Sequence, residues 1–372
     1  MSRHIICLVD GTRVTASSGQ QFSSYSNVYE LAYTLQLRAK SEDGREQIVF
    51  YSSGIASQPG SNGLWNAATG KALRAQVLDQ YTNLCSNYDF EAHDRGRKRD
   101  KIYLFGFSRG AMAVRALAAL IMEYGLLRPK DVRYAPQIIS DWEKSESRPD
   151  VVDPVRVEVE FIGVFDSVMG GIKSWTSLQP IRFPHYNLHK NCVHAVHILA
   201  IDENRRLFQN RSWDRHMRNG GSLRQIWMPG VHADIGGIAG EFWGRISFLT
   251  MAYYIDTLTP LLLEQSWIRA KISKVQDDLD GRNFRIDQHH TLPLLGIRRS
   301  PWNEPAAMES VHPVIDLLPD QFRYNGRPTF PWKKNRFGGV FDAVAPDEEL
   351  ADYFRGIFTP QGDASPATNV SA

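Results

Sequence analysis

Short runs of apolar residues recur along the chain, and each one stops at a turn that contains glycine or an acidic residue. Apolar runs bounded by such turn residues predict buried β-strands. The expected strands are Ile5–Val9, Ile48–Tyr51, Ile102–Phe105, Val157–Phe165, Val193–Ile201 and Gln225–Met228.

Several segments between these runs have the three- and four-residue apolar spacing of a helix. They are residues 27–38, which Ser26 or Asn27 can cap, and residues 72–88 and 109–124. Strands that alternate with helices predict an α/β fold, in which helices cover both faces of a mostly parallel sheet. Ligands bind at the carboxyl ends of the strands in such a sheet, so polar residues that directly follow the strands are the candidates for a site.

The regular pattern predicts a single α/β domain over residues 1–355. Within it, residues 259–335 contain scattered proline and tryptophan, and we expect an irregular insertion or a lid there. The tail 359–372 is small and polar and is expected to be disordered. The aromatic-rich segment 241–258 has two interpretations, a helix that lines an acyl channel and a helix of the core.

The composition is that of an ordinary soluble globular protein, with 42% hydrophobic and 23% charged residues. A net charge of +2 argues against a dedicated nucleic-acid-binding protein, because few phosphates could be neutralised. Cys7, Cys85 and Cys192 are too scattered for a disulfide framework or a zinc site. The start "MSRHIICLVDGT" lacks the layout of a signal peptide, and no apolar stretch reaches the roughly 18 residues of a membrane span. We therefore expect a cytoplasmic location in the producing cell.

The stretch "LFGFSRGA" holds a serine, Ser108, between Gly106 and Gly110. A strand-like run leads into it and an apolar helix leads out, which is the setting of a nucleophile elbow. Glycines on both sides let the serine adopt a strained backbone and let the helix approach the sheet. The start of the helix also supplies free N–H groups and the positive end of its dipole. We interpret Ser108 as a nucleophile, and an ordinary turn is the alternative.

A serine nucleophile needs a base and an acid that orients the base. His232 in "GVHADIGG" follows the last expected strand and is the candidate base. Two candidate acids also follow strands, Asp166 in "GVFDSV" and Asp202 in "AIDENRR". The count of strands after the serine favours Asp202, whereas its charged neighbours indicate an ion-pair cluster and the apolar neighbours of Asp166 favour a dedicated partner. The residues alone leave the two acids almost equal.

Six stretches in matching order resemble one family. They are "LVDGT" (8–12), "FYSSGI" (50–55), "LFGFSRGA" (104–111), "GVFDSV" (163–168), "AIDENRRLF" (200–208) and "GVHADIGG" (230–237). The family is the α/β-hydrolase family that includes the phospholipase effectors of bacterial type VI secretion. The resemblance covers about two thirds of the chain and implies an α/β-hydrolase fold. The C-terminal, lid-like elaboration expected at residues 259–335 lies outside the matching stretches and depends on the sequence pattern alone. The resemblance also implies the triad Ser108, Asp166 and His232, because the family's acid lies in the "FD[ST]V" motif.

The resemblance further implies how the turn after the first strand contributes. A backbone N–H of Gly11 or Thr12 would join that of Arg109 in an oxyanion hole, and Asp10 would brace the turn without being the acid. Three loops depart from the family pattern, at "LVDGTRV", "YSSGIAS" and "HADIGGIAG". Because these loops shape the pocket, the departures leave the substrate less defined than the reaction.

The implied function is that of a serine hydrolase for carboxylic esters, and more specifically a phospholipase A-type lipase that acts as an antibacterial effector. No metal or other cofactor is expected, since the sequence contains no H-E-x-x-H and no clustered Cys/His set. The expected partners are a phospholipid or other ester and an immunity or secretion-apparatus protein, with no nucleic acid. Type VI secretion would place the protein in the periplasm of a target cell.

The basic run at residues 93–101 suggests peripheral membrane contact, and a solvated loop is the alternative interpretation. Two other functions fit the same residues. One is an intracellular esterase that acts on small or neutral-lipid esters. The other is a hydrolase-fold protein that binds a partner without catalysis, and its effect would survive the loss of Ser108.

Overall fold

The fold is that of a computed structural model of the chain. The residues that the structure describes are 2–11, 14, 25–54, 70–144, 152–168, 188, 190–203, 205, 208–213, 221–238, 241–281, 308–318, 323–324, 327–328 and 347–359.

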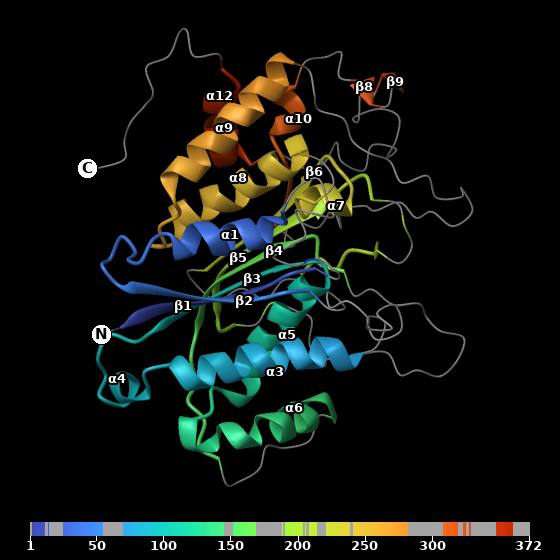
Figure 1. The fold of residues 1–372 in the computed structure, drawn as a ribbon. Coiled ribbons are helices and arrows are strands. Elements are labelled where there is room, and N and C mark those ends of the chain that lie inside the picture. Colours follow the sequence, from blue (N-terminus) through green and yellow to red (C-terminus); the bar gives the residue numbers. More distant parts are fainter. Residues whose placement is uncertain are drawn as a thin grey trace, which may run out of the picture.

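Within the described residues, seven strands form one sheet in which every neighbouring pair is parallel (Figure 1). The strand order is β2-β1-β3-β4-β5-β6-β7, and β8 and β9 form a separate antiparallel pair. The strands are β1 (Arg3–Val9), β2 (Glu46–Ser52), β3 (Lys101–Phe107), β4 (Val159–Phe165), β5 (Cys192–Ala200), β6 (Ser222–Met228), β7 (Glu309–Val311), β8 (Arg323–Tyr324) and β9 (Arg327–Pro328). All six expected strands are present, and β7 is a seventh that the sequence pattern did not predict.

Helices cover both faces of this sheet, as expected for parallel strands (Figure 1). One face carries α3, α5 and α6, and the other carries α1, α8, α9 and α12. The described helices are α1 (Asn27–Gln36), α3 (Gly70–Asn87), α4 (Phe90–Asp94), α5 (Arg109–Tyr124), the 3-10 helix η2 (Pro129–Tyr134), α6 (Ala135–Lys144), α7 (His232–Ile235), α8 (Glu241–Leu258), α9 (Gln265–Asp280), α10 (Val314–Leu317) and α12 (Glu348–Phe358). In the part of the chain that the structure describes, no helix is long and apolar enough to cross a membrane.

The local signals at the ends of two predicted helices act as expected. Of the two candidate caps for α1, the structure uses Ser26, whose hydroxyl accepts a hydrogen bond from the backbone N–H of Tyr29 at 3.0 Å. Helix α5 ends at Gly125, which has a φ of 76°. Helix α5 is buried along almost its whole length, which explains why its sequence is apolar almost all round.

The segment expected to be irregular contains regular elements. Residues 265–280 form helix α9, which packs against α8, and residues 309–311 extend the main sheet as β7. The expectation of irregular structure is therefore wrong for these residues, while the remaining part of the expected lid lies largely outside the described residues, as does the tail from residue 360. Helix α8 is a core helix, because Trp243, Phe248 and Met251 on it are fully buried.

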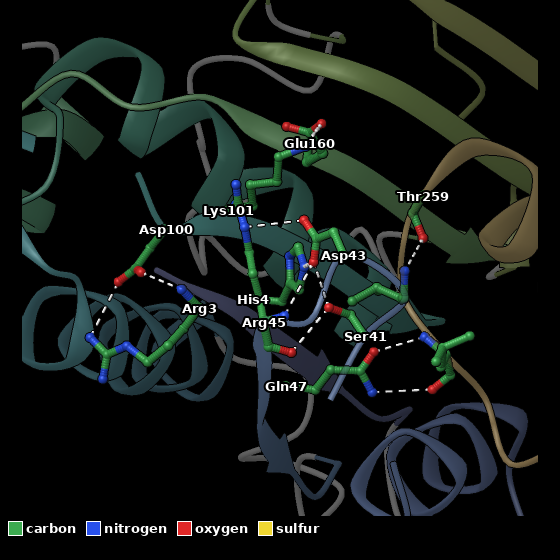
Figure 2. Close-up of polar contacts among 12 residues, drawn as sticks. Arg3, His4, Ser41, Asp43, Arg45, Gln47, Asp100, Lys101, Glu160 and Thr259 are labelled. Carbon is green, nitrogen blue, oxygen red and sulfur yellow. Dashed lines mark hydrogen bonds and ion pairs between the residues drawn. The ribbon is translucent and has the colours of Figure 1, made fainter. Parts of the chain in front are cut away.

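Polar contacts tie the amino ends of the strands together, at the edge of the sheet opposite to the ends that carry the candidate residues (Figure 2). The ring of His4 bridges Asp43, at 2.9 Å from Nε2 to Oδ1, and the hydroxyl of Tyr103, at 3.0 Å from Nδ1. Burial lowers the pKa of His4. Although burial alone would raise the pKa of Asp43, hydrogen bonds from Ser41 and His4 bring it down to about 2. His4 therefore joins β1 to the loop before β2 through Asp43 and to β3 through Tyr103.

Candidate active site

Ser108 lies at the turn between β3 and α5, with a φ of 58° and a ψ of −122°. A non-glycine residue in this region is strained, and such strain persists only where the surroundings fix the backbone. The backbone N–H of Ser108 donates to the carbonyl oxygen of Phe165 at 3.0 Å, which ties the turn to the end of β4. The turn thus presents the serine at the carboxyl edge of the sheet.

The two glycines beside Ser108 are required by close backbone contacts. A Cβ atom on Gly110 would lie 2.2 Å from the carbonyl oxygen of Val9, and one on Gly106 would lie 2.6 Å from the carbonyl oxygen of Gly110. Real Cβ atoms essentially never approach that closely. The missing side chain of Gly110 therefore lets α5 begin directly against the end of β1, and that of Gly106 lets β3 approach the first turn of α5.

The structure brings Ser108, His232 and Asp166 into one chain of hydrogen bonds. Nε2 of His232 lies 2.8 Å from Oγ of Ser108, and Nδ1 lies 2.6 Å from Oδ2 of Asp166. All three residues are buried. Because an ionised carboxylate only accepts hydrogen bonds, Nδ1 carries a proton, and the unprotonated Nε2 of a neutral imidazole can accept the serine proton.

A second hydrogen bond fixes the carboxylate of Asp166. Its Oδ1 accepts the backbone N–H of Ala200 from the end of β5 at 3.1 Å, while its own N–H donates to the carbonyl oxygen of Ile198 at 2.7 Å. The side chain is completely buried, so these partners compensate its removal from water. The amide of Ala200 was not predicted, because nothing in the sequence near residue 166 signals it.

The alternative acid, Asp202, makes a different contact. Its Oδ2 accepts the N–H of Gly230 at 3.0 Å, and its own N–H donates to the carbonyl oxygen of Gly230 at 3.0 Å. This reciprocal pair joins the turn after β5 to the turn after β6. Of the two candidate acids, the structure therefore brings Asp166, and not Asp202, to the imidazole nitrogen of His232.

Two aromatic rings that the sequence did not single out enclose the imidazole of His232. Phe107, the residue before Ser108, packs at a centroid distance of 4.7 Å with an interplanar angle of 30°. Phe208 approaches from another direction at 4.8 Å and 67°. The ring is thus held by apolar contacts in addition to its two hydrogen bonds.

The carboxylate of Asp10 accepts three hydrogen bonds at the turn after β1. Its Oδ1 accepts the N–H of Gly11 at 2.7 Å, and its Oδ2 accepts the hydroxyls of Ser26 and of Tyr51, the latter at 2.8 Å. Burial raises the pKa of Asp10 to about 6 in spite of these three hydrogen bonds. Ser26 and Tyr51 reach Asp10 from α1 and β2, so no local sequence signal could have identified them.

The positions of Arg109 and Gly11 decide how well their backbone N–H groups suit the expected oxyanion hole. Arg109 is the first residue of α5, where a backbone N–H has no acceptor within the helix. The N–H of Gly11 is donated to Asp10, so this group does not suit the second donor. Thr12, the other candidate, lies outside the described residues.

A buried polar layer lies behind Asp166. The N–H of Ser167 donates to Nε2 of His197 at 3.1 Å, and its hydroxyl accepts a hydrogen bond from Nη1 of Arg115 at 3.1 Å. The guanidinium carbon of Arg115 lies 4.8 Å from the centre of the Trp213 ring. Arg115, six positions after the start of α5 and almost fully buried, thereby fastens the segment that carries the acid.

A buried serine bonded to an imidazole, which is bonded in turn to a carboxylate, is equipped for nucleophilic attack on a carbonyl. Among the described residues, no three His, Cys, Asp or Glu side chains gather in a way that could hold a metal ion.

A family model for the catalytic domain of Tle1-like phospholipase effectors of the type VI secretion system matches residues 3–256. The chain belongs to this family. The match runs from β1 into α8 and includes Ser108, Asp166 and His232. The resemblance to this family seen in the sequence is thus confirmed, and the parallel sheet with helices on both faces confirms the expected α/β fold.

The individual proteins to which this chain is similar share 27% sequence identity or less with it in the three comparisons below. The uncharacterized protein YEL023C of Saccharomyces cerevisiae is 27% identical in an alignment of 239 residues, and the match covers 56% of this chain and 32% of the yeast protein. A Tle1 effector bound to the VgrG spike of a type VI secretion system shares 20% identity at a TM-score of 0.39, over 65% of this chain and 52% of that one. An uncharacterized protein from Pseudomonas aeruginosa shares 17% identity at a TM-score of 0.44, over 74% of this chain and 49% of that one. The chain thus spans about a third of the curated relative and about half of these two structures.

Proposed function

We propose that this protein is a serine hydrolase that cleaves the carboxylic esters of phospholipids, with Ser108, His232 and Asp166 as its catalytic triad. The observation that carries the proposal is the unbroken series of hydrogen bonds from Oγ of Ser108 through both ring nitrogens of His232 to Oδ2 of Asp166. The positive φ of Ser108 at a strand–turn–helix junction supports it independently.

In the first step, Oγ of Ser108 attacks the ester carbonyl and Nε2 of His232 takes its proton. Asp166 stabilises the imidazolium that forms and keeps the proton of Nδ1 in place. The C–O bond to the leaving alcohol then breaks, and His232 gives its new proton to that oxygen. Water, activated by the same histidine, hydrolyses the acyl-serine, releases the fatty acid and restores the free hydroxyl.

The negative charge on the carbonyl oxygen needs hydrogen-bond donors during both steps. The N–H of Arg109 at the start of α5 is the first donor in this proposal, and that of Thr12 is the second. Losing one donor of this kind typically costs about 10²–10³ in rate. The hydrogen bond from the N–H of Gly11 to Asp10 fixes the backbone of Gly11, the residue before Thr12. In this proposal Asp10 therefore holds the turn from which Thr12 donates.

The family supports phospholipid as the substrate class, because its description names the catalytic domain of a phospholipase effector. On the basis of the same family description, we extend the proposal to an exported antibacterial role and to a partner in the secretion apparatus.

The position of the basic run at residues 93–101 argues against a membrane contact of this run that would deliver substrate to Ser108. The run precedes and enters β3 at Lys101, at the amino end of the strand, while Ser108 follows the other end, roughly 20 Å away. A lipid surface that feeds Ser108 would lie against the carboxyl edge of the sheet.

Fatty-acid release from mixed phospholipid vesicles, from a triglyceride emulsion and from a short soluble ester tests the proposal. The enzyme is compared with Ser108→Ala and with Ser41→Ala, which removes a buried serine at the opposite end of the sheet. We expect release from phospholipid that falls at least about 10³-fold in folded Ser108→Ala and persists in Ser41→Ala.

The other outcomes separate the parts of the proposal. Turnover of the short ester that depends on Ser108, without release from vesicles, would keep the triad and reject phospholipid as the substrate. Release that is the same in Ser108→Ala would reject the triad itself.

A further inference from the structure

The loop after β5 holds a buried acidic residue that directly contacts the segment carrying His232. Glu203 is only 1% exposed, and its Oε2 accepts the backbone N–H of His232 at 3.3 Å. His232 is the first residue of α7, a helix of four residues that follows a glycine turn. An element this short has little rigidity of its own. The contact from Glu203 therefore fixes the main chain at the point where His232 begins.

Arg205 neutralises Glu203 and sets its orientation. Nε of Arg205 donates to Oε1 at 2.9 Å, Nη2 donates to Oε2 at 2.7 Å, and the backbone N–H of Arg205 donates to Oε1 at 2.8 Å. A two-pronged pair of this kind has a defined geometry, and it compensates the burial of the carboxylate. The sequence indicated an ion-pair cluster here, but it gave no sign that the cluster reaches His232.

The same arginine connects to the ring of His232 through an aromatic side chain. The guanidinium carbon of Arg205 lies 3.7 Å from the centre of the Phe208 ring, and that ring packs against the imidazole at 4.8 Å. The loop thus contacts His232 twice, at the backbone through Glu203 and at the ring through Phe208. Phe107 limits the ring on another side.

We propose that Glu203, Arg205 and Phe208 act together as positioning residues that hold His232 within reach of both Ser108 and Asp166. This inference rests on the proposed triad. The two hydrogen bonds of the imidazole, 2.8 and 2.6 Å long, must be kept at once. A displacement of about 1 Å in a catalytic group can cost about 10² in rate, so a device that fixes both the backbone and the ring has a direct effect on turnover.

The charges around His232 make the inference testable by pH. Among the described residues, the ring of His232 is bonded to Asp166, which follows β4, and to Ser108 at the β3–α5 turn, and its backbone N–H is bonded to Glu203, which pairs with Arg205. Asp234 lies two positions after His232 on α7 and accepts the N–H of Val231. Glu203→Gln removes a negative charge and leaves Arg205 unopposed, which disfavours the imidazolium. Arg205→Gln removes a positive charge next to Glu203, which favours the imidazolium.

The test measures inactivation by a fluorophosphonate ester as a function of pH, because this probe phosphonylates an activated serine. We expect the acid limb of the profile to move by about half a pH unit or more, to lower pH in Glu203→Gln and to higher pH in Arg205→Gln. Arg205→Lys restores the charge and should return the limb toward the wild-type position. Phe208→Leu should lower the maximal rate about 10- to 100-fold without moving the limb, and Phe208→Tyr should recover most of that loss.

Glu30→Gln is the control for burial alone, since Glu30 is a buried carboxylate paired with Lys271 away from the site. It should lower the unfolding temperature and leave the acid limb unchanged. Acid limbs that stay at the wild-type position in both charge variants, or that move in the same direction, would overturn the inference. Should Glu203→Gln fail to fold, Arg205→Gln with its lysine rescue and the two Phe208 variants decide the matter.

The outcome for the wild type separates this inference from the proposed function. Phosphonylation of Ser108 with unaltered rates and profiles in all the loop variants would reject the positioning role and leave the triad standing. A wild-type protein that the probe does not modify at Ser108 would instead reject the triad.

Discussion

Ser108 and Asp166 both have a positive φ, 58° and 39°, and they follow neighbouring parallel strands, β3 and β4. Among the described residues, Met308 is the other non-glycine with this property. The two strained residues are also joined through the backbone, since the N–H of Ser108 donates to the carbonyl oxygen of Phe165. Strain of about 1–3 kcal/mol at each position is maintained by the surrounding sheet. It turns both side chains toward His232.

Because the three triad residues are proposed to act as one unit, the losses in kcat caused by substituting them singly should not multiply in a double variant. We expect Ser108→Ala and Asp166→Asn each to lower kcat on a soluble ester by roughly 10⁴-fold or more, and the double variant to be no slower than the slower single variant. Steady-state kinetics with active-site titration checks this. Multiplied losses in the double variant would show that the two residues act independently.

Substitution of Asp166 should mainly lower the activity, whereas substitution of Asp202 should mainly lower the stability. Oδ2 of Asp202 accepts the N–H of Gly230, and Asp202→Asn replaces this charged acceptor with a neutral one. We therefore expect a loss of about 1 kcal/mol in the free energy of unfolding and less than a tenfold loss of activity at temperatures where the variant is folded. Parallel urea unfolding and kinetics measure both quantities. A folded Asp202→Asn protein that is as inactive as Asp166→Asn would contradict this assignment.

Gly110 should tolerate no side chain. A Cβ there would lie 2.2 Å from the carbonyl oxygen of Val9, so Gly110→Ala is expected to cost about 3 kcal/mol or more, or to prevent folding. Gly356 on α12 is the matched control, because nothing lies within 4 Å of its added Cβ. Gly356→Ala should be neutral or stabilise the protein by up to about 1 kcal/mol. Thermal unfolding of both variants checks the contrast, and equal effects would argue against the close approach of α5 and β1.

The raised pKa of Asp10 predicts a pH dependence of stability. Burial lifts this pKa from 3.8 to about 6 in the folded protein. Between these values the folded state holds a proton that the unfolded state releases, so the free energy of unfolding falls as the pH rises through that window. Asp10→Asn does not titrate. From pH 4 to pH 7, the wild type should therefore lose roughly 2–3 kcal/mol relative to Asp10→Asn.

Urea unfolding of both proteins at the two pH values measures this difference. A constant difference between wild type and variant would mean that Asp10 titrates normally in the folded protein.

Local pattern was sufficient for most of the sheet, and it singled out two of the three residues of the proposed triad. The six longer strands are apolar runs, and Ser108 and His232 each follow one of them. Strand β7, with three residues and the sequence Glu-Ser-Val, carries no such pattern and depends on pairing with β6. Helix α9 did have a signal, since Ile268, Ile272 and Val275 follow helical spacing, but its many charged residues obscured it.

The choice of acid shows why part of the site could not be predicted locally. Asp166 and Asp202 both follow strands, and they differ only in which distant backbone or ring they meet. The strand count and the chemistry of neighbouring residues pointed in opposite directions, and the family motif decided in favour of Asp166. The partners of Asp10 and the rings around His232 likewise come from separate elements, so they required the folded structure.

The central claim is that Ser108 is the nucleophile activated by His232, and covalent trapping tests it most directly. The protein is treated with a fluorophosphonate ester, digested and analysed by peptide mass spectrometry, beside Ser108→Ala and His232→Ala. The account predicts one modified peptide, which contains Ser108, in the wild type and none in either folded variant. A modified residue elsewhere, or ester hydrolysis that continues unchanged in Ser108→Ala, would contradict it.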